Sequence, residues 1–222
     1  MEKLPKINII YEDNHLLVVE KPINIPVCKD ESNDLDLLSI LKLYLKEKYD
    51  KKGNVYLGLV HRLDRPVGGI IVFAKTSKAA SRLSNQIREH KITKTYYAVV
   101  ENKIDNKGTL KDYLIKDNKT NITKTTTKDK GKEAILTYQK IKTIDNLSLI
   151  KINLETGRPH QIRVQFSSRN NPLYGDKKYN KKTNNDNIAL FAKQLSFYHP
   201  ITKELLSFEL DLPKRYPFTL FK

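Results

Sequence analysis

The stretch HRLDRPVGGIIVFAKTSKAASRLSNQIREHK occupies residues 61–91 and holds a charged turn, an apolar run and a helical pattern in direct succession. Residues 68–75 form a continuous apolar run of strand length, which predicts a strand buried on both faces. Residues 77–91 begin with a serine and place Ala80, Leu83 and Ile87 on one face, so we expect a helix. The charged turn therefore stands directly ahead of a buried strand.

Upstream of this stretch, the sequence predicts two strands, a loop and a helix. Residues 7–20 read as two β-runs around a turn at 12–14, and the two prolines within residues 21–29 indicate an ordered loop. Residues 35–49 carry leucines and a tyrosine at helical spacing, with acidic residues in the first turn, and predict an amphipathic helix. Residues 58–60 are a short strand candidate.

Downstream, the pattern is mostly that of strands. Residues 93–101 are rich in aromatic and β-branched residues and predict a strand. The Lys/Thr-rich segment 116–132 predicts the tip of a hairpin, and Pro159 predicts the start of a short helix. Further strands are predicted around Ala134, Leu136 and Tyr138, around Ile150, Ile152 and Leu154, and over residues 188–200 and 204–210.

The order of these elements indicates the fold class. Strands and helices do not alternate as βαβ units, so a parallel doubly wound sheet is not expected. The sequence shows no internal repeat and no interdomain linker, and 222 residues fit one large domain. We therefore predict one α+β domain over residues 1–222, with a mixed, mostly antiparallel central sheet flanked by helices and loops.

The composition excludes several classes of protein. The single cysteine, Cys28, cannot form an internal disulfide. No apolar run approaches the length of a membrane span, and the first residues lack the apolar stretch of a secretory signal, so we expect a cytoplasmic protein. The 41 Lys and Arg residues outweigh 25 Asp and Glu residues, giving a net charge of +16. This excess indicates either a polyanionic partner or a lysine-rich compositional bias.

Motifs for cofactors and metals are absent from the sequence. There is no GxGxxG fingerprint, no Walker A motif and no GxSxG elbow. The five histidines and the cysteine show no metal-ligand spacing such as HExxH or CxxC. We therefore expect no cofactor and no metal, with the chemistry performed by side chains alone.

Four of the eight arginines fall in two short segments, and the first of these is HRLDR, residues 61–65. Asp64 lies between Arg62 and Arg65, and cationic neighbours favour the ionised form of a carboxylate. A carboxylate is a competent covalent nucleophile toward an electrophilic carbon such as an anomeric centre. Taken alone, the segment is more typical of a structural Arg–Asp pair at a strand edge.

The second arginine-rich segment is GRPHQIR, residues 157–163. His160 and Arg163 are expected in the first helical turn, where backbone N–H groups favour anions. Arg158 and Arg163 are candidates to bind phosphate, or one of them to hold a buried carboxylate in a bidentate pair. The alternatives are a basic helix start that pairs with surface acids, and a structural role for His160.

Taken together, these segments resemble the RluA-type pseudouridine synthase family. Six blocks match in family order over nearly the whole chain: IIYEDNHLLVVEKPINIPV (9–27), LVHRLDRPVGGIIVFAKTSKAASRL (59–83), KTYYAVV (94–100), LETGRPHQIRVQF (154–166), YGDKKY (174–179) and LFAKQLSFYHP (190–200). The order and spacing of six blocks are far more specific than any single motif.

The resemblance implies the pseudouridine synthase fold and an isomerase that converts uridine to pseudouridine in structured rRNA or tRNA, without cofactor or metal. The target nucleotide would be flipped out of the stack. Asp64 matches the family's catalytic nucleophile, which attacks either C1′ of the ribose or C6 of the uracil. The sequence leaves both routes open.

Other site residues follow from the same resemblance. Tyr96 matches the active-site tyrosine that packs on the base, with Tyr97 as the alternative because neighbouring side chains of a strand face opposite sides. Arg163 matches the arginine that pairs with the catalytic carboxylate, and Arg62 the residue that enters the RNA. Ile162 resembles the apolar wall of the uracil pocket, and we expect Arg65, Arg158 and His160 to contact the RNA.

Two departures from the family accompany the match. Val67-Gly68 stands where many members have Thr-Ser, which removes hydroxyl groups near the nucleophile. The N-terminal S4-type RNA-binding domain of many relatives is not expected here, so RNA capture would depend on the basic surface. The resemblance implies a monomer with no obligate protein partner and no membrane association. The alternative function is a catalytically silent RNA-binding protein, whereas a glycoside-cleaving enzyme would need a second carboxylate.

Overall fold

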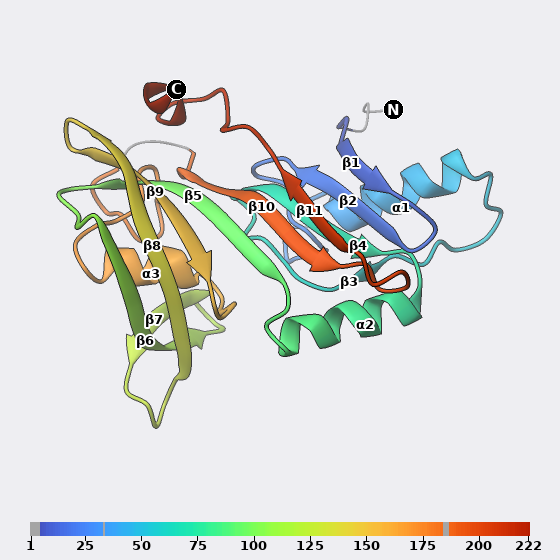
Figure 1. Ribbon diagram of the computed structural model, residues 1–222, viewed down its shortest axis with the longest axis horizontal. Helices are drawn as coiled ribbons and strands as arrows, with labels where there is room; N and C mark the ends of the chain where they lie inside the picture. Colours follow the sequence, from blue (N-terminus) through green and yellow to red (C-terminus); the bar gives the residue numbers. More distant parts are fainter. Residues whose placement is uncertain (1–4, 33, 184–186) are drawn as a thin grey trace. The chain divides into compact units, whose positions relative to one another are not determined.

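The computed structural model describes residues 5–32, 34–183 and 187–222, which form two compact units (Figure 1). Unit 1 extends to Thr93 and includes Gln194–Leu210, whereas unit 2 comprises Lys94–Lys193 and Asp211–Lys222. Each unit therefore takes its residues from two separate stretches of the chain. That residues 1–222 form a single domain remains a prediction.

The sheet of unit 1 is built around one fully buried strand. All seven residues of β4 (Gly68–Ala74) are buried, which confirms the prediction for the apolar run. The sheet order is β1 (Asn8–Glu12), β2 (Leu16–Lys21), β4 and β10 (Leu190–Tyr198), with β3 (Gly58–Leu59) paired to β4 and β11 (Leu205–Glu209) paired to β10. The pairs β1–β2, β2–β4, β3–β4 and β10–β11 are antiparallel.

Two helices of twelve residues each belong to unit 1 and begin with side-chain caps. Asp36 accepts a hydrogen bond from the N–H of Ser39 at the start of α1 (Leu37–Lys48). Thr76 accepts from the N–H of Ala79 at the start of α2 (Ser77–Arg88). Such caps satisfy donors that the first helical turn leaves open. Both helices were predicted, but the acid of α1 lies at the N-cap and no acidic residue occupies the first turn.

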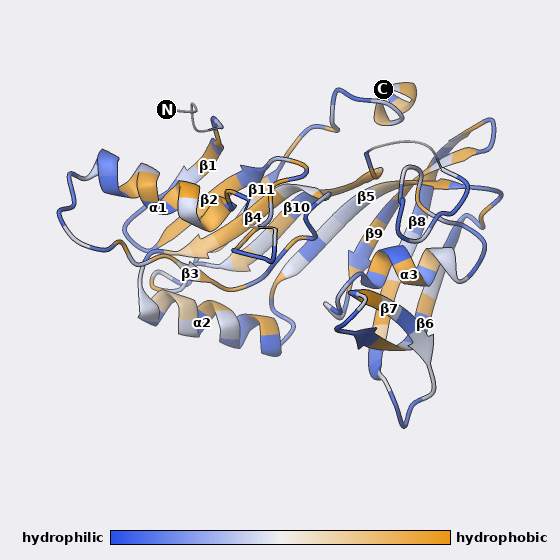
Figure 2. Ribbon diagram, turned by 180° about the vertical axis from the view of Figure 1, so that it is seen from behind, coloured by the Kyte–Doolittle hydropathy of each residue, from blue (hydrophilic) through white to orange (hydrophobic). Residues whose placement is uncertain are grey.

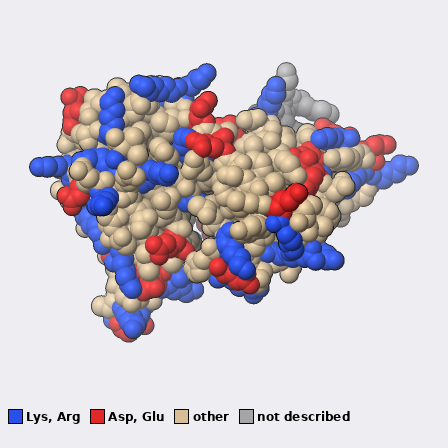
Figure 3. Space-filling view, in the orientation of Figure 1, with Lys and Arg blue, Asp and Glu red and all other residues tan. Residues whose placement is uncertain are grey.

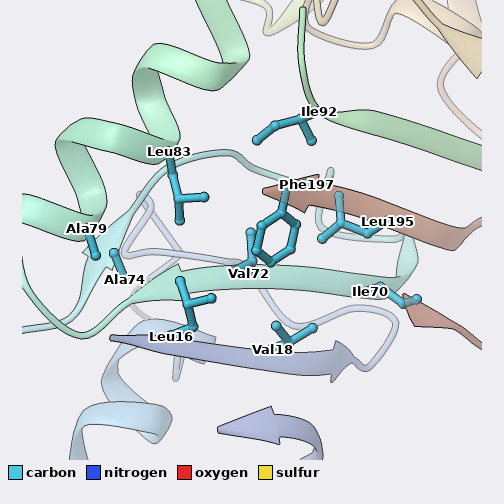
Figure 4. Close-up of a cluster of buried hydrophobic side chains, with 10 residues drawn as sticks. All are labelled: Leu16, Val18, Ile70, Val72, Ala74, Ala79, Leu83, Ile92, Leu195 and Phe197. Atoms are coloured by element: carbon cyan, nitrogen blue, oxygen red, sulfur yellow. The ribbon is translucent and has the colours of Figure 1, made fainter. Parts of the chain in front are cut away.

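Figure 4 shows the core that joins α2 to the sheet of unit 1. Ala79 and Leu83 of α2 point toward the strands, where Val72 and Phe197 are fully buried. Leu16, Val18, Ile70, Ala74, Ile92 and Leu195 complete the cluster. Burying a side chain of this size stabilises the fold by about 1.5–3 kcal/mol, so the cluster fixes the strand that follows the HRLDR turn.

The sheet of unit 2 has five strands in the order β5, β9, β8, β6, β7, and each successive pair is antiparallel. Their bounds are β5 (Thr93–Glu101), β6 (Lys107–Asp117), β7 (Ile122–Thr126), β8 (Lys132–Ile144) and β9 (Leu147–Leu154). The short helix α3 (Gln161–Ser167) lies on one face of this sheet, in front of the strands in Figure 2 and behind them in Figure 1. The last element is a 3-10 turn over Phe218–Phe221.

Two predictions for unit 2 need correction. The segment 116–132 is not a single hairpin tip, because it contains β7 between two turns. Thr123 of β7 is only 1% exposed and its N–H donates to the Tyr179 hydroxyl, and this packing holds the segment as a strand. The short helix begins at Gln161 rather than at Pro159, because His160 adopts a left-handed conformation with φ of 53°.

The α+β class with mostly antiparallel pairing is confirmed. Figure 2 shows the hydrophobic residues concentrated along the strands, with hydrophilic residues on most loops. Among the residues that the structure describes, no helix has the length and apolar character needed to cross a bilayer.

Candidate active site

The predicted site residues fall into two groups, one in each unit. Arg62, Asp64 and Arg65 belong to unit 1 and lie between β3 and β4. Tyr96 belongs to β5 of unit 2. Arg158, His160, Ile162 and Arg163 lie in or just before α3 of unit 2.

A tight turn presents Asp64 in unit 1. The N–H of Val67 donates to the carbonyl of Asp64 at 2.9 Å, which closes the four-residue turn. Leu63 and Val67 are 7% and 2% exposed and anchor the turn on both sides, while Asp64 itself is half-buried. Gly69 follows with φ of 119°, a conformation that residues with a side chain rarely adopt.

Lys21 fixes this turn from inside the protein. Its side chain is 1% exposed, and its ammonium donates to the carbonyls of Pro22 at 2.8 Å, Arg65 at 2.9 Å and Val67 at 2.8 Å. An ammonium has three donors and here each has an acceptor, so the buried cation is fully hydrogen-bonded. Two of the three carbonyls lie within three residues of Asp64, which gives the nucleophile candidate a rigid backbone.

Burial lowers the pKa of Lys21 to about 7, and the negative charge of Asp64 opposes this shift. A lysine whose pKa is displaced this far toward neutrality is uncommon outside functional sites. The positive charge of Arg65 lowers the pKa of Lys21 further. The ammonium that supports the turn therefore titrates close to physiological pH.

The Val67-Gly68 pair is explained by the same contacts. Val67 contributes its backbone carbonyl to Lys21, so this bond needs no hydroxyl side chain at that position. A Cβ at Gly68 would lie 3.2 Å from both Ile23 Cγ2 and the carbonyl oxygen of Lys21. That spacing is tight, and glycine lets the start of β4 approach the end of β2 closely.

The neighbours of Asp64 have different surroundings. Arg62 is exposed. The guanidinium of Arg65 donates to the Asn24 carbonyl at 3.2 Å and to Ser32 Oγ at 2.9 Å, and it forms an ion pair with Asp34. His61 Nε2 accepts from the N–H of Val72 at 3.3 Å and ties the turn to β4.

In unit 2, the strand register separates the two tyrosines. Tyr96 pairs with Ile152 of β9, and Ile152 pairs with Tyr138 of β8. Residues directly opposite one another share a face of the sheet. The Tyr138 ring packs against the Phe166 ring of α3, and the ring centres lie 5.4 Å apart. Tyr96 therefore lies on the face covered by α3 and Tyr97 on the other.

Arg163 is held in a buried bidentate ion pair. Its Nε and Nη2 atoms lie 2.9 Å and 2.7 Å from the two carboxylate oxygens of Asp176. The side chains are 6% and 0% exposed, so both charges are shielded from solvent. The planar guanidinium matches a carboxylate in this geometry, which fixes the orientation of the arginine as well as its charge.

Tyr179 connects this pair to His160 and to β7. The Arg163 guanidinium lies 5.0 Å from the centre of the Tyr179 ring. The Tyr179 hydroxyl accepts from the N–H of Thr123 at 2.9 Å and lies 2.7 Å from His160 Nδ1. Burial raises the pKa of Tyr179, so the hydroxyl keeps its proton at neutral pH. The left-handed residue before α3 is thus fixed by a tyrosine from outside the helix.

Gln161 pins the loop that precedes α3. Its side-chain oxygen accepts from the N–H of Arg158 at 3.0 Å and from Thr156 Oγ1 at 2.9 Å. The Nε atom of Arg158 donates to the Glu133 carbonyl at 2.8 Å, which ties the loop to β8. Ile162 is 4% exposed and anchors the first helical turn.

The sequence missed Lys21 and Asp176 as parts of this site. Lys21 ends the apolar run LLVVEK, and a charged residue joined to a buried strand is the signal that could have found it. Asp176 falls within the YGDKKY block, where it was matched without a role. Within the described ranges, no group of three His, Cys, Asp or Glu residues is placed to hold a metal ion.

The chain is similar in sequence to known RNA pseudouridine synthases. The sequence profile described as RNA pseudouridylate synthase matches residues 15–168. The chain is 34% identical over 221 residues to ribosomal large subunit pseudouridine synthase D of Zymomonas mobilis, covering 94% of this chain and 70% of that protein. It is 34% identical over 215 residues to the uncharacterized RNA pseudouridine synthase YhcT of Bacillus subtilis, covering 94% and 69%.

A solved structure shows the same fold. The human RNA pseudouridylate synthase domain containing 4 superposes with a TM-score of 0.80 and 21% identity, covering 96% of this chain and 92% of that one. The family predicted from the six sequence blocks is thereby confirmed. The chain belongs to the RluA-type RNA pseudouridylate synthases and is an isomerase that acts on RNA.

Proposed function

We propose that the chain isomerises a uridine in ribosomal RNA, with transfer RNA as the other substrate class, and that Asp64 is the nucleophile. The C1′–N1 bond of the nucleotide breaks, a C1′–C5 bond forms, and the proton on C5 is released while N1 gains one. The product has the same composition as the substrate, so no oxidant, reductant or co-substrate is needed. Attack by Asp64 at C1′ or at C6 satisfies this balance equally.

The rigid turn around Asp64 carries this proposal. A nucleophile accelerates a reaction most when it is held close to the attacked carbon before the reaction starts. Lys21 donates hydrogen bonds to the Arg65 and Val67 carbonyls, and the Val67 N–H donates to the Asp64 carbonyl. These hydrogen bonds restrict movement of the turn away from a bound nucleotide.

The residues of unit 2 take the supporting roles. Tyr96 stacks on the target base and its hydroxyl is the base at a ribose C–H. Arg163, oriented by Asp176, pairs with the catalytic carboxylate during the reaction. Ile162 forms the apolar wall of the uracil pocket. Tyr96 suits this role better than Tyr97 because it shares a sheet face with α3.

Four further residues contact the RNA in this proposal. Arg62 is exposed and enters the RNA to replace the everted nucleotide, an event that costs a few kcal/mol of stacking. Arg65, Arg158 and His160 complete the contacts near the phosphates. Arg65 and Arg158 also hold protein backbone, so their contribution to RNA binding is smaller than that of Arg62. The enzyme acts as a cytoplasmic monomer, without cofactor, metal or obligate protein partner.

Release of tritium from RNA labelled at C5 of uridine tests the nucleophile. We expect wild-type protein to release tritium to water and Asp64→Asn, which keeps the shape of the side chain, to release none. The exposed turn residue Asp129 supplies a matched control, and Asp129→Asn should retain full activity. Equal release by wild type and Asp64→Asn would refute the assignment, and RNA binding without any release would favour the silent RNA-binding alternative.

Mapping pseudouridines in total RNA identifies the substrate. A deletion strain should lose one or a few pseudouridines, and complementation with the wild-type gene but not with Asp64→Asn should restore them. Loss confined to ribosomal RNA supports the proposed class, and loss confined to transfer RNA replaces it with the other.

A further inference from the structure

One row of side chains crosses the sheet of unit 2 on the face opposite α3. Lys107 of β6 pairs with Gln139 of β8, Gln139 with Lys151 of β9, and Lys151 with Tyr97 of β5. Lys193 is the last residue of β10 that belongs to unit 2, and its ammonium lies 5.3 Å from the centre of the Tyr97 ring, which extends the row to a fifth strand. We call these five residues the lysine row.

A second row of uncharged polar residues runs beside the lysine row. It contains Thr109, Thr137, Asn153 and Thr95, each directly opposite the next. The two rows border an open depression of about 420 Å³, whose lining includes Lys107, Gln139, Lys151, Thr137 and Asn153. Two lysines, two side-chain amides and a threonine hydroxyl therefore line the depression. Together with Tyr97 and Lys193, which continue the row beyond it, they form one polar, basic strip.

No carboxylate belongs to either row. In the part of the chain that the structure describes, Lys107 and Lys151 form no ion pair, whereas Lys111 on the same strand as Lys107 is paired with Glu133 at 2.8 Å. Figure 3 has the orientation of Figure 1, which shows the face of the sheet opposite α3, and Lys and Arg side chains, with some Asp and Glu among them, are spread over the area of β5, β9, β8 and β6. The charges of Lys107 and Lys151 are thus available to an external anion.

The dimensions of the strip suit a nucleic-acid backbone. Five neighbouring strands at about 4.8 Å spacing span roughly 19 Å, which covers several phosphates of one strand. Lysine ammoniums bind phosphates as point charges, and aromatic rings between them are typical of surfaces that follow single strands. An acidic protein surface would also match the charge, but the polar second row offers donors suited to phosphate and sugar oxygens.

We propose that the lysine row binds the phosphodiester backbone of the RNA substrate at a point outside the candidate active site. Tyr96 lies on the α3 face and the lysine row on the other, so the two contact different parts of the RNA. This inference rests on the proposed function, because the occupant is the RNA that carries the target uridine. The row would hold an extended or flanking segment and contribute affinity without contacting the reacting base.

Charge reversal with a matched control tests the proposal. The double variant Lys107→Glu/Lys151→Glu lowers the net charge by four, and so does the control Lys46→Glu/Lys78→Glu on exposed positions of α1 and α2. Dissociation constants are measured against a long fragment of ribosomal RNA over a range of salt concentrations. We expect the row variant to bind about tenfold more weakly than the control at 0.1 M salt, and its log–log salt slope to fall by about 1.5.

Two further measurements keep the result interpretable. Lys107→Gln/Lys151→Gln removes the charge without adding acids and should show a smaller loss of affinity in the same direction. A short stem-loop that holds only the target region should be affected less than the long fragment. If the row variants and the control bind the RNA with equal affinity, the inference is wrong. The same result is expected if the strip binds an acidic protein instead of RNA. Binding is measured without turnover, so failure of the wild type to release tritium would refute the proposed function separately.

Discussion

The two halves of the candidate active site use opposite charges for the same purpose. In unit 1 a buried cation, Lys21, supports a turn that presents a carboxylate, Asp64. In unit 2 a buried carboxylate, Asp176, supports a cation, Arg163. In each half the residue proposed to act in catalysis is supported by a buried group that sequence motifs did not single out.

The comparison also shows why the two supporting groups differ in kind. Lys21 donates to three separate carbonyls, which suits a compact ammonium with three donors. Asp176 orients a planar group, which requires two parallel hydrogen bonds. Exchanging either group for a residue of similar size should therefore fail for a different physical reason in each half.

Removing Arg163 from its ion pair with Asp176 in unit 2 should produce the largest effect. Arg163→Ala leaves the Asp176 carboxylate buried without its partner, which costs about 3–5 kcal/mol of stability, and it removes the charge that we propose pairs with the catalytic carboxylate. We expect tritium release to fall by about 1,000-fold, while RNA binding changes little.

Arg163→Lys and Asp176→Asn sharpen this result. Arg163→Lys keeps the charge but loses the bidentate geometry and should recover only part of the rate. Asp176→Asn keeps Arg163 but loosens its orientation. A loss of RNA affinity as large as the loss of rate in Arg163→Ala would contradict a role in the chemistry.

The two tyrosines of β5 offer the next comparison. Tyr96→Phe keeps the ring on the α3 face but removes the hydroxyl, and we expect the rate to fall by about 100-fold if proton transfer passes through it. Tyr97→Phe changes the same group on the opposite face and should leave the rate of tritium release on a short stem-loop within about twofold. Full activity of Tyr96→Phe, measured by single-turnover tritium release, would remove the hydroxyl from the mechanism.

Breaking the unit 1 anchor should have a smaller effect on rate and a clear effect on stability. Lys21→Met fills a similar volume but leaves three carbonyls without their donor, so we expect a loss of about 2 kcal/mol in the free energy of unfolding. The rate should fall by about tenfold, because a misplacement of about 1 Å already costs up to 100-fold. Lys29→Met, at an exposed position, is the control. Unchanged denaturant midpoints for Lys21→Met would contradict the anchoring role.

The pH dependence of the unit 1 anchor should have the smallest effect on rate, although its effect on stability is measurable. The pKa of Lys21 is about 7 in the folded protein and about 10.4 in an unfolded chain. Between these values the unfolded chain binds more protons, so the contribution of Lys21 to the free energy of unfolding rises with pH, by at most about 1.4 kcal/mol per unit. The melting temperature of wild type relative to Lys21→Met should increase over this range.

Activity should change in the opposite direction over the same range. A neutral amine has two N–H donors for three carbonyls, so the turn loses one support as the pH rises above about 7. The rate of wild type should fall by a few-fold relative to its value at pH 6.5, while that of Lys21→Met stays flat. Parallel pH profiles of the two rates would show that the titration of Lys21 does not affect the activity attributed to Asp64.

Local patterns predicted most elements of the fold. The apolar run before α2 became β4, and residues 93–101 formed β5 with the predicted bounds. β7 was missed because its Lys/Thr pattern resembles a solvated loop, whereas its pairing with β6 and the burial of Thr123 against Tyr179 depend on tertiary structure. The start of α3 was misplaced because a left-handed residue at position 160 depends on tertiary contacts that no local pattern contains.

The candidate site was predictable to a different extent in each half. The named residues came from motif blocks, which identify side chains but not the groups that hold them. Lys21 lies 43 positions before Asp64 in the sequence (64 − 21), and Asp176 lies 13 positions after Arg163. Contacts over such separations follow from the folded topology, so the sequence alone could not assign these supporting roles.

The division of unit 1 between two stretches of sequence also constrains its synthesis. β10 and β11 complete the sheet of unit 1, but the 100 residues of Lys94–Lys193 precede Gln194 in the chain. At about 5–20 residues per second, a ribosome needs roughly 5–20 seconds to cross that interval. Until β10 emerges, the side of β4 opposite β2 is paired only with the two-residue strand β3 and presents an apolar edge that favours aggregation. The nascent chain therefore passes through a period in which chaperones have a natural target.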